Sequence, residues 1–294
     1  MNLYIKVFWY NPPTGNFGDE ICPYLIRKIS GKTPICCRPT IKGAIHDLID
    51  SVYKRKSIKE ALLRLRFIFM NDPIILGVGS ILTLSNRRTI AWGAGFTSKT
   101  NIIKSGNFRA VRGQETAKRL KELGLLPPNI YGDPALLLPL YYNPLIQKKY
   151  AIGIIPHISE YSYFYERWSN NYRIINLRTK DVESVIDQIK ECEYILSSSL
   201  HGIIVSHSYG IPCLWIESRV LEKDGFKFID YFSSVGIAPY RGFNNIEDIL
   251  ASEDNIRNLF MDNTDKSHIN TSLNDIQKNL LSVCPFLNNV YKSN

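Results

Sequence analysis

The sequence predicts an α/β protein made of two doubly wound units with parallel sheets. Short apolar segments typical of strands alternate with segments of helical periodicity along the first three quarters of the chain, an order that favours parallel sheets. Glycine-rich or polar loops follow several of these strands. The length of 294 residues is enough for about two domains of roughly 150 residues each.

The first unit opens with a strand, a glycine loop and a helix. Residues 3–10 are rich in β-branched and aromatic side chains, the loop follows at residues 14–19, and residues 20–30 have helical spacing. Gly31 stands where a helix C-cap favours glycine. The other elements expected in this unit are strands at residues 73–78, 89–92 and 108–111 and a helix at residues 114–123.

The second unit begins with a near-continuous apolar strand at residues 150–155. A linker is expected at residues 139–144, so we divide the chain into domains 1–145 and 146–294, with a helical tail from about residue 254. The other elements expected in this unit are strands at residues 172–177, 194–198 and 212–216 and helices at residues 181–192 and 200–209.

The chain is basic, with 36 Lys and Arg against 27 Asp and Glu, a formal charge of +9. Much of the excess lies in residues 38–70, where apolar and basic residues alternate as in helices that lie on a membrane surface. We expect a basic helical excursion there that docks on a membrane carrying a lipid-linked sugar, or simply a solvated basic face. Charge alone favours anionic partners without choosing among them.

Composition and cysteine usage exclude several classes. An apolar content of 45% and a charged content of 21% do not fit disordered or collagen-like chains. The six cysteines include no C-x-x-C pair, and the first ten residues contain no secretory h-region. We therefore expect a cytoplasmic protein with reduced thiols, working at the inner face of the membrane.

The segment Ser197–His201 is the strongest candidate for chemistry. A buried strand ends there in Ser197, Ser198 and Ser199, and a helix then begins with His201 in its first turn. Free N–H groups at a helix N-terminus attract anions, and histidine exchanges protons near neutral pH. A capping serine beside a packed histidine would explain the same pattern. His207 is expected on the other side of the helix in a structural role.

Arginines and a second histidine follow other strands. Arg112 and Arg178 each come after a strand, where a guanidinium could grip a carboxylate or phosphate. His157 directly follows the strand at 150–155. Asp19 and Asp133 follow glycines, where a carboxylate often caps a turn.

The loop Gly77-Val-Gly79-Ser80 is a weak phosphate-loop signal. It lacks the third glycine of a dinucleotide loop and the Gly-Lys of a P-loop, so a nicotinamide enzyme is disfavoured.

These motifs together resemble the polysaccharide pyruvyl transferase family. The resemblance rests on their order and spacing between about residues 15 and 216. The motifs are Asn16-Phe-Gly18-Asp19-Glu20, Gly77-Val-Gly79-Ser80, Trp92-Gly-Ala-Gly95, Arg112-Gly-Gln-Glu115, Tyr131-Gly-Asp-Pro-Ala135, Ile155-Pro-His157 and Ser197-Ser-Ser-Leu-His-Gly202 through Gly210-Ile-Pro212. One departure is Gly113, because the family commonly has Asp or Glu after this arginine; Glu115 is expected to substitute.

The resemblance implies two Rossmann-like domains facing a cleft, as in the glycosyltransferase-B fold. It implies transfer of the pyruvyl group of phosphoenolpyruvate onto a pair of sugar hydroxyls, giving a pyruvate ketal in a bacterial exopolysaccharide or capsule precursor. His201 is expected to act as the acid and base, with His157 as a second and Arg112 in the donor clamp. The expected substrate-binding residues are Arg178, Ser197, Ser198, Ser199, Asn16, Gly18, Asp19, Gly79, Ser80 and Glu115.

No cofactor or metal is expected, and the acceptor would be nucleotide- or lipid-linked. No nucleic acid partner is expected. Two alternatives stay open at this point, a nucleotide-sugar-dependent glycosyltransferase and a non-catalytic protein that binds polysaccharides or polyanions.

Overall fold

A computed structural model describes residues 3–40, 72–217 and 224–287, together with residues 42, 43, 45 and 49. Most of the basic excursion expected at residues 38–70 lies outside these residues, so the predicted membrane-surface helices do too. Within the part of the chain that is described, no helix is both long enough and apolar enough to cross a membrane.

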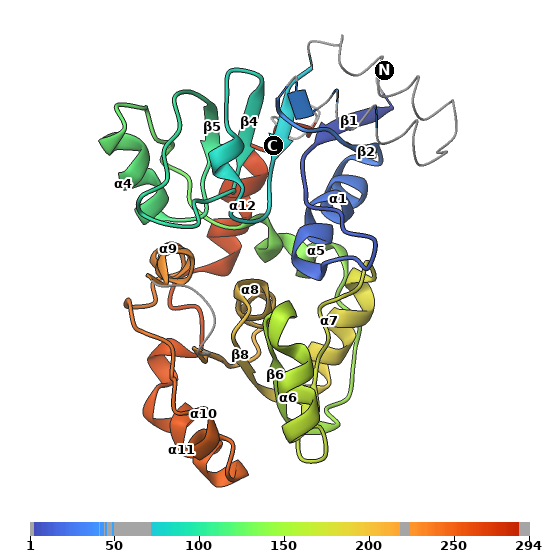
Figure 1. The fold of residues 1–294 in the computed structure, drawn as a ribbon, viewed down its shortest axis with the longest axis vertical. Coiled ribbons are helices and arrows are strands. Elements are labelled where there is room, and N and C mark those ends of the chain that lie inside the picture. The colour runs from blue at the N-terminus through green and yellow to red at the C-terminus, as the bar shows by residue number, and fades with distance from the viewer. Residues whose placement is uncertain are drawn as a thin grey trace.

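The first sheet contains five parallel strands in the order β2-β1-β3-β4-β5 (Figure 1). Sequence patterns predicted each of them except β2, which contains Pro34. Proline removes a ladder donor, and β2 lies at the edge of the sheet, where this loss is tolerated. The strands are β1 (Tyr4–Val7), β2 (Thr33–Cys36), β3 (Ile74–Leu76), β4 (Thr89–Trp92) and β5 (Asn107–Ala110), with helices α1 (Phe17–Ser30), η1 (Leu82–Leu84) and α4 (Gln114–Glu122).

The second sheet contains four parallel strands in the order β7-β6-β8-β9. The strand expected at residues 172–177 is only two residues long, because the chain then leaves the sheet edge and the carbonyl of Leu177 accepts a hydrogen bond from the N–H of Phe17. The strands are β6 (Tyr150–Ile155), β7 (Arg173–Ile174), β8 (Cys192–Ser197) and β9 (Cys213–Trp215), with helices η3 (Ile158–Glu160), α6 (Tyr161–Trp168), α7 (Val182–Lys190), α8 (Leu200–Ser208) and α9 (Phe226–Ser234). The prediction of an α/β protein with parallel sheets is confirmed.

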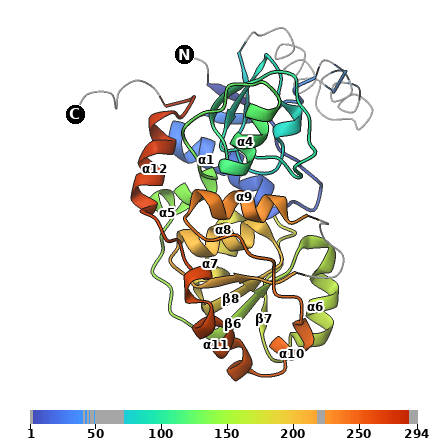
Figure 2. The ribbon, with the colours of Figure 1, turned by 90° about the vertical axis from the view of Figure 1, so that its left-hand side faces the viewer.

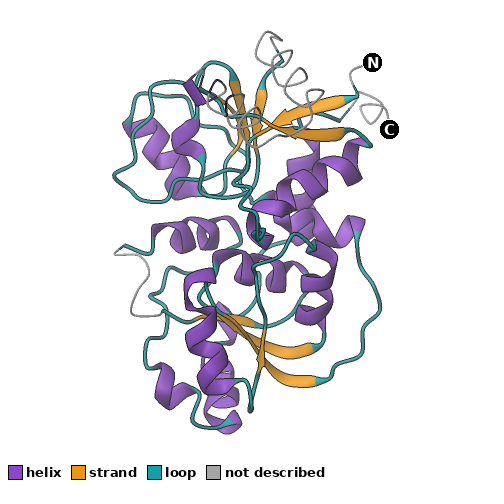
Figure 3. Cartoon of the chain, turned by 45° about the vertical axis from the view of Figure 1, so that its right-hand side comes forward, coloured by secondary structure: helices purple, strands orange, loops and turns teal. Residues whose placement is uncertain are grey.

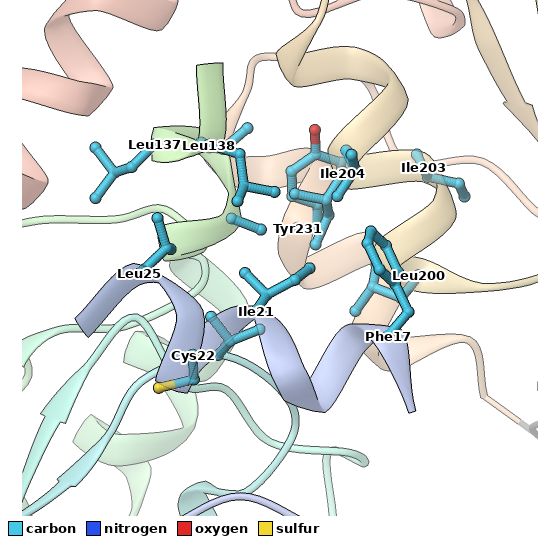
Figure 4. Close-up of a cluster of buried hydrophobic side chains, with 14 of the residues drawn as sticks. Phe17, Ile21, Cys22, Leu25, Leu137, Leu138, Leu200, Ile203, Ile204 and Tyr231 are labelled. Carbon is cyan, nitrogen blue, oxygen red and sulfur yellow. The ribbon is translucent and has the colours of Figure 1, made fainter. Parts of the chain in front are cut away.

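The two sheets lie at opposite ends of the molecule with helices between them (Figure 3). These helices share one hydrophobic core, to which α1 contributes Phe17, Ile21 and Leu25 and α8 contributes Leu200 and Ile203 (Figure 4). The segment that joins the two sheets enters this core through η2 (Pro134–Leu137) and α5 (Leu138–Tyr141). The hydrophobic core is therefore continuous between the two sheet regions.

The tail connects both ends of the molecule (Figure 2). After α10 (Ile246–Ile249), the helix α11 (Glu253–Asp262) packs Ile256 and Phe260 into the core beside the second sheet. The chain continues through η4 (Thr264–Lys266) to α12 (Leu273–Ser282), which returns to the first sheet, where the indole N–H of Trp92 donates to the carbonyl of Leu280 at 2.9 Å.

Candidate functional site

The strand order places a switch point in each sheet. β1 connects to β2 on one side while β3 lies on its other side, and β6 is flanked in the same way by β7 and β8. In open parallel sheets, ligands bind beyond the carboxyl ends of the strands at such points. The loops at the two switch points carry Asn16–Asp19 and Gly77–Ser80 in the first sheet, and His157 and Ser197–His201 in the second.

The two switch points meet at Gly18 and His201. A Cβ atom at Gly18 would lie 2.1 Å from Nδ1 of His201, so only glycine leaves room for the ring there. Gly18 is in the first turn of α1, whose N-cap is Asn16; the Asn16 side chain accepts a hydrogen bond from the N–H of Gly18 at 3.1 Å. Asn16 thus builds the turn on which His201 rests.

Ser197 and Ser198 build the loop that carries His201. The Ser197 hydroxyl lies 2.9 Å from the carbonyl oxygen of Ile155 and accepts from the N–H of Ser199. The Ser198 hydroxyl accepts from the N–H of His157 and donates to Glu160, both at 2.8 Å. Ser199 is the N-cap of α8 but makes no side-chain capping bond, which leaves the N–H groups of this helix end without a side-chain cap.

His201 and Asp133 face each other inside the protein. Nε2 of His201 lies 3.9 Å from Oδ2 of Asp133, and both atoms are buried without a hydrogen-bond partner. Burial lowers the pKa of His201 to about 3, helped by the positive charges of Arg112 and Lys227. Burial raises the pKa of Asp133 to about 6. The backbone N–H groups of Ala135 and Gly79 and the positive charge of Arg112 act in the opposite direction and lower this pKa.

Lys227 brings a positive charge to both predicted histidines. It lies in the first turn of α9 and is half-buried. Burial, followed by the charge of Lys227, lowers the pKa of His157 to about 4. Nδ1 of His157 lies 2.9 Å from the hydroxyl of Ser159. We call His201, Asp133, His157 and Lys227 the His201 cluster.

Arg112 bonds to a different set of residues. Its guanidinium donates to Asp230 at 2.9 Å, to the Ser80 hydroxyl at 2.6 Å and to the carbonyl of Phe96 at 2.5 Å, and its side chain is fully buried. Asp230 also accepts two bonds from Thr116, through the backbone N–H and the hydroxyl, each 2.7 Å long. The bonds from Arg112 use three of the five N–H donors of the guanidinium. We call Arg112, Asp230, Thr116 and Ser80 the Arg112 cluster.

The acid beside Arg112 is Asp230 and not Glu115. A Cβ at Gly113 would lie 1.7 Å from the carbonyl oxygen of Asp230, so α9 packs directly on this glycine. Glu115 lines a different cavity, of about 360 Å³, together with Lys99, Lys118, Arg119 and Phe226. Glu115 was expected to substitute for the acid that the family commonly has at position 113, but the carboxylate that bonds to Arg112 is that of Asp230.

The remaining predicted residues flank the His201 cluster on two sides. Arg178 is exposed after β7, and its guanidinium donates to the carbonyl of Ile158 at 3.1 Å, one residue beyond His157. Asp19 lies next to Gly79, because a Cβ atom at Gly79 would be 4.0 Å from Oδ1 of Asp19. Burial and the neighbouring Glu20 carboxylate raise the pKa of Asp19 to about 7.

Sequence patterns missed Lys227 and Asp230 because α9, with the sequence FKFIDYFSS, carries no recognised motif. Asp133 was expected to cap a turn, and it does cap η2. Its position opposite His201 was not predicted. The prediction for His207 is confirmed, because its ring is buried, with Nδ1 3.1 Å from the Tyr231 hydroxyl and Nε2 3.0 Å from the carbonyl of Cys213.

Among the residues that the structure describes, no group of three or more His, Cys, Asp or Glu side chains is arranged to hold a metal ion. All six cysteines are free thiols. Independence of metals stays a prediction.

The fold and this site define an α/β protein of the kind that holds ligands where parallel strands end. Comparison with known families then identifies the group. A profile described as polysaccharide pyruvyl transferase matches residues 16–219, a range that includes both switch points. The chain belongs to the polysaccharide pyruvyl transferase family, and the predicted resemblance is confirmed.

Two curated relatives are similar to this chain over part of their length. The uncharacterized protein L143 of Acanthamoeba polyphaga mimivirus is 35% identical over 176 residues, which are 56% of this chain and 61% of the relative. The succinoglycan biosynthesis protein ExoV of Rhizobium meliloti (strain 1021) is 24% identical over 184 residues, 56% of this chain and 55% of the relative. The chain thus spans less than two thirds of the length of either relative.

Proposed function

We propose that this protein transfers the pyruvyl group of phosphoenolpyruvate to two hydroxyls of a sugar, forming a pyruvate ketal in polysaccharide biosynthesis. The observation that carries the proposal is the His201 cluster, in which Lys227 brings a positive charge to two histidines at the switch point of the second sheet, in a chain of this family. The two sheet units, divided near residue 145, would act as the two domains of a glycosyltransferase-B-like enzyme, with donor and acceptor between them.

The donor is an anion with a phosphate and a carboxylate, so it needs cationic partners and N–H donors. Lys227 brings a positive charge to His157, and the Arg178 guanidinium bonds to the carbonyl of Ile158, the next residue. The α8 N-terminus, without a side-chain cap, supplies backbone N–H groups. In this assignment Arg112 supports the site from behind, because three hydrogen bonds hold its buried guanidinium within the Arg112 cluster.

The chemistry requires one proton donor and two proton acceptors in sequence. Protonation of the donor's methylene carbon forms a C–H bond from the π electrons and leaves a cationic carbon. One sugar hydroxyl attacks that carbon and gives up its proton, phosphate leaves with the electrons of the C–O bond, and the second hydroxyl closes the ketal with loss of its own proton. His201 is the proposed acid in the first step and then recovers a proton from a hydroxyl.

His201 is neutral at pH 7 in the free protein, because burial, Arg112 and Lys227 lower its pKa to about 3. An anionic donor beside Lys227 would offset this positive charge and raise the pKa of the imidazole, which then takes up the proton that it delivers. Donor binding would in this way prepare the acid.

Asp19 is the proposed acceptor-side carboxylate. It lies in the first turn of α1, next to Gly18, which contacts the His201 ring. A pKa of about 7 suits a group that accepts a hydroxyl proton near neutral pH. We propose that the acceptor is lipid-linked, because residues 38–70 are rich in Lys and Arg. Co-sedimentation of the protein with lipid vesicles tests this.

Binding and product formation test the proposal together. Thermal melting of the full chain is followed with phosphoenolpyruvate, with UDP and with UDP-sugars, since a ligand of the native state raises the melting temperature. Turnover is measured as phosphate released from phosphoenolpyruvate with sugar acceptors, and the ketal is detected by NMR. Stabilisation by UDP-sugars alone, without phosphate release from phosphoenolpyruvate, would replace the proposal by nucleotide-sugar-dependent glycosyl transfer.

A further inference from the structure

Two buried polar atoms that lack partners face each other across the site. Nε2 of His201 and Oδ2 of Asp133 are 3.9 Å apart, with side-chain exposures of 15% and 0%. Buried polar atoms in proteins are nearly always hydrogen-bonded, so an unsatisfied pair in contact range needs an explanation. In enzymes without bound substrate, hydrogen bonds of the working site are often long and shorten in the complex.

Asp133 is held so that one carboxylate oxygen stays available. Oδ1 accepts the N–H of Ala135 at 2.9 Å and thereby caps η2. Pro134, the residue after Asp133, packs against Gly93. A Cβ at Gly93 would lie 2.2 Å from the proline ring, so only glycine leaves room for it. With Oδ1 occupied and the turn packed, Oδ2 is the oxygen that points to His201.

His201 is held from the opposite side. Gly18 of α1 lies beside the ring, and a side chain at this position would collide with it. The ring therefore lies between the first turn of α1 and the η2 cap, with Nδ1 on the α1 side and Nε2 on the Asp133 side.

We propose that Asp133 is a positioning residue for His201, whose Nε2–H it accepts, so that Nδ1 is the nitrogen that exchanges a proton with the ligand. A carboxylate paired with an imidazole in this way selects one tautomer and stabilises the imidazolium that forms during the reaction. The pairing itself does not depend on the donor; only the identity of the group that exchanges a proton with Nδ1 rests on the proposed function.

The charged and titratable groups around the pair come from several elements. Asp19 and Cys22 lie on α1, Arg112 precedes α4, and Lys227 and Asp230 lie on α9. Arg112 is the positive charge that affects both partners, because it lowers the pKa of Asp133 and that of His201. Arg112 therefore favours an ionised Asp133 beside a neutral His201. An ionised carboxylate has no proton to donate, so Asp133 can only accept a hydrogen bond from the imidazole.

The test is the tautomer of His201 in the full chain labelled with ¹⁵N-histidine. Nitrogen chemical shifts distinguish Nδ1–H, Nε2–H and doubly protonated rings, and His201→Gln assigns the signals. We expect the Nε2–H form in the wild type. Asp133→Asn retains an oxygen for the η2 cap but offers an amide that donates, so we expect the variant to shift toward the Nδ1–H form.

His207 is the internal control in the same spectra. It lies on the same helix, is buried, and bonds through both ring nitrogens to Tyr231 and Cys213, so its signals should not change in Asp133→Asn. In turnover assays the same variant should lower kcat by about 10²- to 10⁴-fold while KM for phosphoenolpyruvate changes little. A purely structural role would not separate kcat from KM or move the tautomer of one histidine alone.

A wild-type Nδ1–H tautomer would overturn the pairing, and this result needs no variant to fold. The same conclusion follows if Asp133→Asn leaves both the His201 tautomer and kcat as in the wild type. If the protein releases no phosphate from phosphoenolpyruvate while the tautomer and its shift are as expected, the pairing stands and the proposed function fails.

Discussion

The Arg112 cluster and the His201 cluster are both buried and both charged, yet they satisfy their polar atoms differently. Arg112 and Asp230 have side chains with no exposure and bond to each other, to Thr116, to Ser80 and to a backbone carbonyl. Nε2 of His201 and Oδ2 of Asp133 are also buried, but neither atom has a hydrogen-bond partner. The bonded charge pair joins parts of the fold, whereas a pair with buried atoms that lack partners is a candidate for ligand binding.

The same contrast occurs within helix α8. His201 and His207 are six residues apart, and burial lowers the pKa of both, to about 3 and about 4. A lowered pKa therefore does not distinguish the histidine that we propose to be catalytic from the one with two bonded ring nitrogens. The hydrogen bonds do, because His207 has two partners while Nε2 of His201 has none.

Arg112→Ala should have the largest effect on stability. Removing one partner of a buried ion pair leaves the other charge unpaired and costs about 3–5 kcal/mol. We expect a corresponding loss in the free energy of unfolding, measured by urea denaturation. A variant of wild-type stability that binds phosphoenolpyruvate poorly would instead return Arg112 to the donor clamp.

His201→Gln should remove activity without unfolding the protein. Loss of a general acid and base lowers kcat by roughly 10²- to 10⁴-fold. The matched variant His207→Gln should show the opposite behaviour, losing about 1–3 kcal/mol of stability because Tyr231 and Cys213 lose a buried partner, while the folded fraction remains active. Equal kcat values for the two variants would remove His201 from the mechanism.

Lys227→Met should weaken donor binding by about 10- to 100-fold, the range for one hydrogen bond to a charged group. The effect belongs in KM and in the shift of melting temperature with phosphoenolpyruvate. Lys149→Met is the control, because Lys149 pairs with Glu191 next to the start of β6, at the end of the sheet opposite the site. Similar weakening in both variants would mean that only net charge matters.

The smallest predicted effect concerns stability against pH. The folded pKa of His201, about 3, lies below its unfolded value near 6.5, so between these values the unfolded chain binds one more proton. This lowers wild-type stability as pH falls below 6.5. His201→Gln lacks this proton, so relative to the wild type it should gain about 1–2 kcal/mol between pH 7.5 and pH 5. A constant difference across this range would contradict the neutral buried imidazole.

Much of the fold was predictable because local patterns carried it. The strands at residues 89–92 and 150–155 and the Gly31 cap are found where periodicity and turn chemistry placed them. The strand β2 was not predicted, because it contains a proline, and β7 is shorter than the strand expected at residues 172–177.

The sequence by itself determined the parallel α/β architecture, the family, and the positions of His157, His201 and the glycine loops, because periodicity, turns and motif order are local properties. Tertiary structure alone decided which side chains meet. It brought Asp230 to Arg112 across 118 residues, brought Lys227 to both histidines, and left Asp133 facing His201. Such contacts depend on how the shared helical core packs the two sheet regions together, and no local pattern records that packing.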